Sequence, residues 1–178
     1  MNRNRFLLAV IGLVSMLGGV LLFNLLQPDS PKIRPASAET AIELHSIPLF
    51  DLSGQQTTIG NWEGNILIVN FWAPWCAPCR REVPSLIKIH REYAQQGVRV
   101  LGIALDSKPQ VSRFATDYQI NYPLFLGGNR TAMYNAAFGN PSGSLPFTAM
   151  LDRNQRILFQ HNGELSVEQL LEQLEALL

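Results

Sequence analysis

Residues 71–80 read Phe71-Trp72-Ala73-Pro74-Trp75-Cys76-Ala77-Pro78-Cys79-Arg80 and contain both cysteines of this 178-residue chain. An apolar run leads into this segment, and helix-forming sequence leads out of it. Two thiols separated by two residues at the start of a helix can close an intramolecular disulfide and open it again. The spacing therefore predicts a redox-active dithiol and the chemistry of thiol–disulfide exchange.

The sequence on both sides of the dithiol alternates between strand-like and helix-like segments. Continuous apolar runs predict buried strands at 65–72 and 98–105, and apolar residues at helical spacing predict a helix at 77–95. Other expected strands are 47–51, 55–59, 122–126, 147–151 and 156–161, and other expected helices are 109–118, 131–138 and, after the cap Ser166, a helix to Leu178. This order predicts an α/β protein with a central mixed β-sheet flanked by helices on both faces.

The length and the charge of the chain limit the kinds of function that it can have. The chain is long enough for one domain with a sizeable core. Its formal net charge is zero, so no basic field points to nucleic acid as a partner.

The N-terminus has a different composition from the rest of the chain. The segment from Phe6 to Leu26 has no formal charge and is mostly apolar. At about 1.5 Å per residue it would reach roughly 31 Å as a helix, which matches a bilayer core. A cleaved signal peptide is the alternative, with Ala36-Ser37-Ala38 as the cleavage site, but the apolar segment is long for a signal and that site is distant. We favour an N-terminal transmembrane helix that stays attached.

This interpretation divides the chain into a cytoplasmic N-terminus at 1–5, the anchor at 6–26 in the lipid bilayer, a linker at 27–40 rich in proline, serine and alanine, and a domain at 41–178. Charges on the two sides of the anchor favour the N-terminus inside by a small margin. We therefore expect a single-pass protein of a bacterial-type cytoplasmic membrane with its domain on the extracytoplasmic (periplasmic) side. Disulfides persist in that compartment.

Three motifs resemble those of a known family. Asn70–Cys79 leads into the helix, Arg80-Arg81-Glu82-Val83-Pro84 follows, and Ser144-Leu145-Pro146-Phe147-Thr148 precedes a strand. From about Ser46 to Leu178 the chain resembles membrane-anchored, extracytoplasmic thioredoxin-like proteins of the TlpA/ResA/DsbE-like group. The resemblance implies a thioredoxin-like fold and thiol–disulfide oxidoreductase activity without a cofactor.

The two cysteines are expected to have different roles. Cys76 would lie at the first helical turn, where free N–H groups and the helix dipole stabilise a thiolate, so it is the expected nucleophile. Cys79, one turn further, would be buried and would resolve the mixed disulfide. The alternatives are a permanent disulfide or half of a zinc site. Structural zinc needs about four ligands, and the three histidines are scattered, so we expect no metal.

Glu82 is the candidate acid–base group. It lies three residues after Cys79 and therefore on the same helix face. The resemblance implies a glutamate held near the thiols, where burial would raise its pKa and let it exchange a proton with Cys79. The alternative is a solvated carboxylate paired with Arg80 or Arg81. Asn70 stands where ordinary thioredoxins carry a buried aspartate, and because it cannot titrate it favours Glu82 in that role.

The substrate is expected to contact residues on both sides of the dithiol. By resemblance, Pro146 would face the sulfurs after a cis bond from Leu145, and the Leu145 backbone would pair with an extended substrate segment. A trans proline opening an edge strand is the alternative. Trp75 is expected to line the contact surface, whereas Trp72 is expected to pack in or beside the core.

Two prolines are expected to shape the helix. Pro78 fits its first turn, where a missing N–H costs nothing. Pro84 lies further along and is predicted to bend the helix, as a proline does in thioredoxin-like proteins.

The leading hypothesis is an enzyme that reduces disulfides outside the cytoplasm. The Ala77-Pro78 pair resembles the Gly-Pro of reducing thioredoxins, which favours a reductase. The resemblance implies protein substrates such as apocytochrome c and a membrane thiol as electron donor. A peroxiredoxin-like thiol peroxidase and a copper metallochaperone are alternatives. Both fit less well, because peroxiredoxins place their cysteine in another loop and related copper carriers have a wider cysteine spacing.

Overall fold

The computed structural model describes residues 44–178. The predicted anchor at 6–26 and linker at 27–40 lie outside the described residues, as do the first three residues of the predicted domain. Within 44–178 there is no helix with the length and apolar character needed to cross a bilayer.

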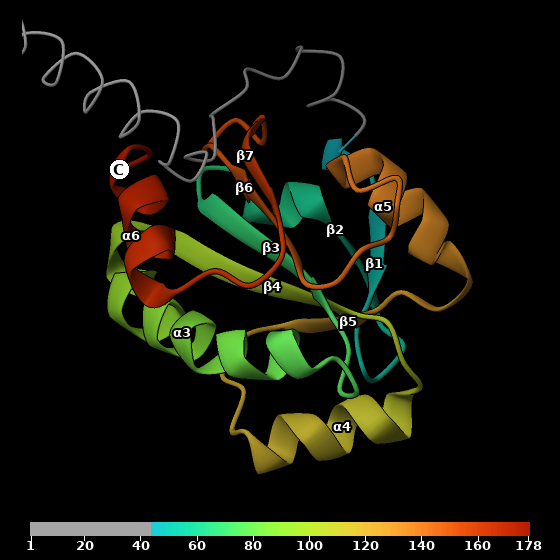
Figure 1. Cartoon of the computed structure of the whole chain (residues 1–178). Helices are drawn as coiled ribbons and strands as arrows, with labels where there is room; N and C mark the ends of the chain where they lie inside the picture. The colour runs from blue at the N-terminus through green and yellow to red at the C-terminus, as the bar shows by residue number, and fades with distance from the viewer. Residues whose placement is uncertain (1–43) are drawn as a thin grey trace, which may run out of the picture. The chain divides into compact units, whose positions relative to one another are not determined.

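The centre of the described part is a five-stranded sheet in the order β5-β4-β3-β6-β7 (Figure 1). Strands β3, β4 and β5 run parallel to one another, whereas β6 is antiparallel to both β3 and β7. The prediction of a mixed sheet is therefore confirmed. The strands are β3 (Ile66–Trp72), β4 (Val98–Ala104), β5 (Leu124–Leu126), β6 (Phe147–Leu151) and β7 (Ile157–Asn162).

Helices cover both faces of this sheet, as predicted (Figure 1). Helices α3, α4 and α6 contribute to the core on one face, and α5 contributes to the core on the other. The helices are α3 (Ala77–Tyr93), α4 (Lys108–Asp117), α5 (Thr131–Phe138) and α6 (Val167–Glu175), with short 3-10 helices at Ile59–Trp62, Ala94–Gln96 and Gly128–Arg130.

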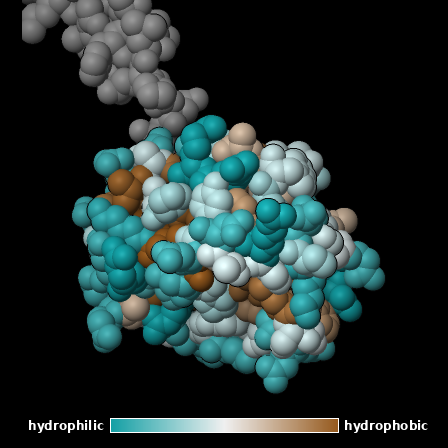
Figure 2. Space-filling view, turned by 90° about the horizontal axis from the view of Figure 1, so that it is seen from below, coloured by the Kyte–Doolittle hydropathy of each residue, from teal (hydrophilic) through white to brown (hydrophobic). Residues whose placement is uncertain are grey.

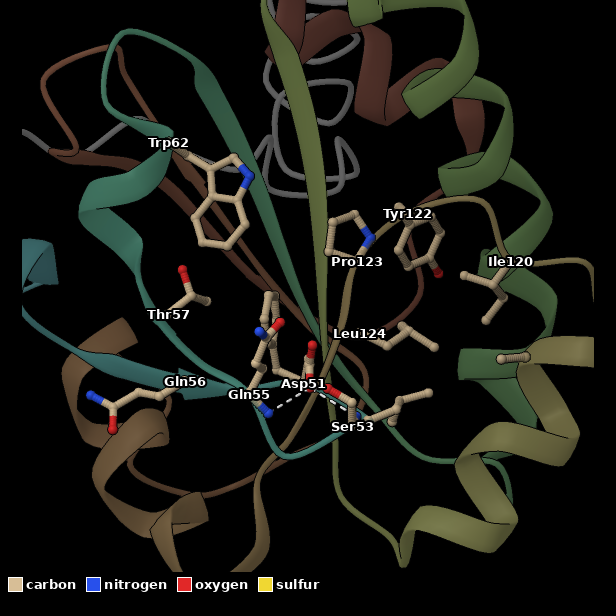
Figure 3. A pocket seen from close by; sticks show the side chains of 13 residues that line it. Asp51, Ser53, Gln55, Gln56, Thr57, Trp62, Ile120, Tyr122, Pro123 and Leu124 are labelled. Atoms are coloured by element: carbon tan, nitrogen blue, oxygen red, sulfur yellow. Dashed lines mark hydrogen bonds between the residues drawn. The ribbon is translucent and has the colours of Figure 1, made fainter.

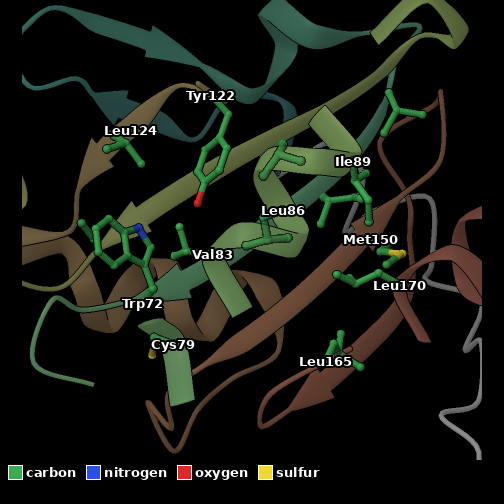
Figure 4. Close-up of a cluster of buried hydrophobic side chains, with 14 of the residues drawn as sticks. Trp72, Cys79, Val83, Leu86, Ile89, Tyr122, Leu124, Met150, Leu165 and Leu170 are labelled. Atoms are coloured by element: carbon green, nitrogen blue, oxygen red, sulfur yellow. The ribbon is translucent and has the colours of Figure 1, made fainter. Parts of the chain in front are cut away.

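The central strand β3 is buried on both faces, and its side chains alternate between the two cores. Ile66, Ile68 and Trp72 pack under α3 in the core that Figure 4 shows. Leu67, Val69 and Phe71 point into the opposite core, which includes Tyr134 and Phe138 of α5. Because alternate residues of a strand share a face, Asn70 lies on the α3 side. This polar side chain is thus placed beneath the helix that carries the cysteines.

The outer surface of the helical layer is polar. Figure 2 views the molecule from the side of α4 and shows hydrophilic residues over most of that face, with hydrophobic ones in small groups. Val111 and Phe114 of α4 are buried, whereas most of its other residues are exposed. Such a division is what an amphipathic helix on a sheet requires.

Several predicted strands are shorter in the structure. The strand expected at 122–126 begins only at Leu124, because Pro123 has no N–H to donate to a β-ladder. The strands expected at 47–51 and 55–59 are β1 (Pro48–Phe50) and β2 (Gln56–Thr58), and Ile59 already begins a 3-10 helix. They form a separate two-stranded sheet, joined to the main sheet by an isolated bridge from Asp51 to Phe125.

The last helix is also shorter than predicted. Ser166 caps α6 as expected, and its side chain accepts a hydrogen bond from the Gln169 N–H. The helix ends at Glu175 instead of Leu178, because the N–H groups of Leu177 and Leu178 both turn back to the carbonyl of Leu174. Leu170 and Leu174 are fully buried, whereas Leu171 and Leu177 are only partly buried.

Candidate active site

The two cysteines lie where β3 passes into α3. Only residues 73–76 separate the end of β3 from the first residue of α3. Cys76 is the N-cap residue of α3, and its sulfur accepts a hydrogen bond of 3.3 Å from the backbone N–H of Cys79. The sulfurs form a disulfide, with 5.3 Å between the two Cα atoms. The dithiol is therefore at the positive end of the helix dipole.

The disulfide lies in an apolar core, and an exposed tryptophan directly precedes it in the chain. Cys76 is 6% exposed and Cys79 is 1% exposed, and both belong to the core beneath α3. Trp75, directly before Cys76, is 68% exposed, whereas Trp72 is fully buried. The predicted core position of Trp72 is thus confirmed. A role for Trp75 in substrate contact stays a prediction.

Glu82 is buried in α3, at 1% exposed, and has its own hydrogen-bond donors. Its Oε2 accepts from Asn70 Nδ2 at 2.9 Å, and its Oε1 accepts from the Leu165 N–H at 3.2 Å. Asn70 Nδ2 also donates to Thr148 Oγ1 of β6 at 3.0 Å. Groups from β3, β6 and the loop before α6 therefore enclose the carboxyl.

Burial has the largest effect on the pKa of the Glu82 carboxyl. Loss of hydration raises the pKa of Glu82 from its usual value of 4.5 to about 7. The hydrogen bonds from Leu165 and Asn70 oppose the rise in pKa, and the negative charge of Glu164 adds to it. Because the pKa lies near neutrality, the carboxyl can hold or release a proton at physiological pH.

The alternative interpretation of Glu82, a solvated carboxylate paired with Arg80 or Arg81, is wrong. Arg81 instead makes a bidentate ion pair with Glu164. Arg80 donates to the hydroxyl of Tyr118 at 3.1 Å. Both arginines lie on the exposed side of α3, whereas Glu82 faces the sheet.

Pro146 directly precedes β6 at the end of the sheet where β3 finishes. The Leu145–Pro146 peptide bond is cis, so the alternative of a trans proline is wrong. Phe147, the next residue, pairs with Phe71 in the register of β6 with β3. Pro146 is therefore level with the end of β3, from which the loop to Cys76 departs.

The two helix prolines are accommodated differently. Pro78 lies in the first turn of α3, as predicted. Pro84 lies inside the helix, which continues through it to Tyr93. The bend expected at Pro84 stays a prediction.

A pocket of about 520 Å³ lies elsewhere, between the β1–β2 hairpin and the β5 edge of the main sheet (Figure 3). Asp51, Gln55, Trp62 and Tyr122 are among its lining residues, whereas neither cysteine nor Glu82 lines it. Three hydrogen bonds within the hairpin already occupy Asp51 Oδ1. The pocket is thus separate from the disulfide chemistry.

Sequence reasoning identified Glu82 but missed the groups that hold it. Asn70 was recognised only as a residue that cannot titrate, whereas it donates to the carboxyl directly. Strand alternation could have found this contact, because Asn70 shares its face with Ile68 and Trp72. The backbone N–H of Leu165 carries no signal in the sequence. No group of three or more metal-ligating side chains occurs within residues 44–178.

Comparison with known proteins places the chain in a family. The model of the Redoxin family matches residues 31–178. The chain belongs to the Redoxin family. Within it, the chain is a thioredoxin-like member of the TlpA/ResA/DsbE group and a thiol–disulfide oxidoreductase, which fits the closed Cys76–Cys79 pair.

Named relatives cover nearly the whole chain. Thiol-disulfide oxidoreductase ResA of Bacillus cereus (strain ATCC 10987 / NRS 248) is 28% identical over 98% of this chain and 98% of its own length. Thioredoxin-like protein YneN of Bacillus subtilis (strain 168) is 30% identical over 92% of this chain and 94% of its own length. The names of these relatives support neither a peroxidase nor a copper carrier.

Solved structures agree on the fold. A secreted thiol-disulfide isomerase from Corynebacterium glutamicum is 30% identical, with a TM-score of 0.66, over 71% of this chain and 79% of its own. A thiol:disulfide interchange protein of the thioredoxin family from Chlorobium tepidum TLS is 22% identical, with a TM-score of 0.65, over 85% of this chain and 99% of its own. The predicted thioredoxin-like fold is confirmed.

The raised pKa of Glu82 predicts a specific pH dependence of stability. A carboxyl whose pKa is higher in the folded than in the unfolded protein contributes stability at low pH, and this contribution is lost as pH rises from about 4.5 to about 7. Relative to Glu82→Gln, the disulfide form of the full chain should therefore lose roughly 3 kcal/mol of unfolding free energy across that interval. Urea denaturation at a series of pH values measures the difference. A difference that does not change with pH would contradict the burial of an ionisable Glu82.

Proposed function

We propose that the protein is a disulfide reductase that acts on other proteins outside the cytoplasm. The observation that carries this proposal is the position of Cys76 at the N-terminus of α3, with a helix N–H directed at its sulfur. In the reduced protein the same N–H and the helix dipole would stabilise a Cys76 thiolate and lower the pKa of its thiol.

The exchange proceeds in two steps. The Cys76 thiolate attacks one sulfur of the target disulfide, so that a mixed disulfide forms and the other target sulfur leaves as a thiolate. Cys79, deprotonated, then attacks the Cys76 sulfur and releases the second target sulfur. Two electrons pass to the target, and the Cys76–Cys79 disulfide remains. A thiol donor in the membrane reduces this disulfide again.

Glu82 serves the second step. Its ionised carboxylate accepts the proton of Cys79 as that thiol becomes a nucleophile, and returns it when the dithiol is regenerated. A carboxyl with a pKa of about 7 suits this role, because both of its protonation states are populated at neutral pH.

The binding surface for the target is formed by Trp75, Leu145 and Pro146. Among residues 44–178, no backbone hydrogen bond involves the N–H or the C=O of Leu145. An extended segment of the target pairs with this free backbone, as in β-strand addition. The exposed ring of Trp75 covers the target beside the sulfurs.

Substitution of each cysteine separates the two steps. We expect Cys76→Ser to lower the rate of reduction of a protein disulfide by at least about 100-fold, because the attacking thiolate is gone. Cys79→Ser should instead accumulate the mixed disulfide, visible as a covalent adduct on non-reducing gels. The control Ala176→Ser adds an exposed hydroxyl just after the end of α6 and should keep activity. Unchanged turnover by Cys76→Ser would remove Cys76 from its role.

Apocytochrome c is the proposed class of target, on the basis of the resemblance to the ResA and DsbE group. Its Cys-x-x-Cys-His segment must be reduced before haem attachment. We expect the reduced full chain to act on an oxidised peptide with this motif at least about fivefold faster than on the same residues in shuffled order, since differences in the contacts that a substrate makes with its binding surface give ratios of this order. Stopped-flow fluorescence of the peptide measures both rates. Equal rates would refute a preference for this motif.

Location follows from the N-terminal segment. Residues 6–26 anchor the chain in a cytoplasmic membrane, residues 27–40 form the linker, and the domain from residue 41 onward lies on the extracytoplasmic side. One solved relative is described as secreted, which agrees with an extracytoplasmic domain. Protease added to spheroplasts should digest the domain while cytoplasmic markers stay intact. Protection of the domain until lysis would place it inside the cell.

A further inference from the structure

The loop Gly139–Ser144 connects α5 to the segment before β6 (Figure 1). One buried asparagine, Asn140, organises this loop. Asn140 is 1% exposed although the loop around it is largely at the surface. A buried amide needs partners for both of its N–H groups and for its carbonyl oxygen, and here all are satisfied within the loop and α5.

The end of α5 fixes the backbone of Asn140. Gly139 has a left-handed φ of 82°, which ends the helix. The Gly139 N–H bonds to the Ala136 carbonyl at 3.2 Å, and the Asn140 N–H bonds to the Asn135 carbonyl at 2.7 Å. This pair of bonds is the Schellman arrangement, so the position of Asn140 is set by the rigid helix.

The side chain of Asn140 in turn fixes the segment that leads to Pro146. Its Nδ2 donates to the backbone carbonyl of Ser144 at 3.0 Å and to Asn135 Oδ1 at 3.1 Å. A backbone carbonyl can only accept, so the atom that faces it must be the amide nitrogen. The hydroxyls of Ser142 and Ser144 lie 3.2 Å from Asn140 Oδ1 on the other side.

Leu145 thus lies between two residues whose backbone carbonyls already accept hydrogen bonds. Asn140 holds the Ser144 carbonyl, and the Gly163 N–H holds the Pro146 carbonyl at 2.8 Å. The single hydroxyl proton of Ser144 goes to Asn162 Oδ1 at the end of β7, so Ser142 is the hydroxyl that donates to Asn140 Oδ1. The Leu145 backbone is held from both sides while its own N–H and C=O make no backbone bond within residues 44–178.

We propose that Asn140 is a positioning residue that holds the Leu145 backbone ready for an extended segment of the protein target, and so determines affinity for protein disulfides. This inference rests on the proposed function. A fixed strand edge binds a peptide more tightly than a mobile one, because the ordering entropy is already lost before binding. Small disulfides need no such edge and react with Cys76 directly.

The test measures how well the full chain reduces two substrates, a disulfide in a protein and a disulfide in a small molecule. We expect Asn140→Ala to raise the KM for reduction of insulin by about tenfold, with kcat nearly unchanged, because binding at the edge is weakened. The rate constant for the small aromatic disulfide 5,5′-dithiobis(2-nitrobenzoate) should stay within about twofold, because the thiols themselves are unaltered. The control Asn129→Ala removes an exposed amide at the opposite end of α5 and should change neither rate.

A second variant covers the case in which Asn140→Ala does not fold. Ser142→Ala removes the hydroxyl that donates to Asn140 Oδ1 and leaves the contact of Ser144 with Asn162 in place, and Ser142 is exposed. We expect a rise in the insulin KM in the same direction, of about threefold, again without a change in the small-disulfide rate. An unchanged insulin KM in this variant, or an equal loss in both assays for either variant, would overturn the role of Asn140. If the unmodified chain reduced neither disulfide, the proposed function itself would fail.

Discussion

The short passage from β3 to α3 is the constraint on which the rest of the site depends. Because β3 is buried on both faces and pairs with β4 and β6, its end is fixed in space, and α3 begins after only four more residues. Cys76 must therefore occupy the helix N-terminus, where the Cys79 N–H, which has no intrahelical partner, donates to its sulfur. The register of β6 with β3 then brings Pro146 level with the same end of the sheet.

A neutral amide beneath the helix allows one carboxyl to be buried there. Both hydrogens of Asn70 Nδ2 are used, one on Glu82 and one on Thr148. An aspartate at position 70 would place two carboxyl groups within hydrogen-bond distance, and one of them would have to stay protonated. With the asparagine, Glu82 is the one carboxyl in this hydrogen-bonded group, and its pKa near 7 is set mainly by loss of hydration.

Much of this arrangement could be predicted from the sequence because its signals are local. The apolar run before Trp72, the spacing of the cysteines and the apolar periodicity after them specify a strand, a turn and a helix in order. The positions of Cys76 and Pro78 follow directly. The cis bond before Pro146 was expected only by resemblance to a family, because sequence alone favours trans for any proline.

The contacts that were missed join residues far apart in the chain. The Leu165 N–H reaches Glu82 across the fold, and no side-chain pattern marks a backbone donor. Asn140 gave no signal either, since an asparagine between glycine and proline usually marks a turn. Its burial depends on the way α5 ends. The boundaries of β5 and α6 were wrong because a proline and a terminal turn interrupt otherwise regular apolar patterns.

The reduction potential of the Cys76–Cys79 couple tests the central claim most directly. It is measured by equilibrating the full chain with dithiothreitol or glutathione buffers of known ratio and quantifying the two forms by mass spectrometry. A reductase of the kind proposed should have a potential near that of thioredoxin, about −270 mV. A value near that of DsbA, about −120 mV, would make the protein an oxidant and contradict the proposed direction of exchange.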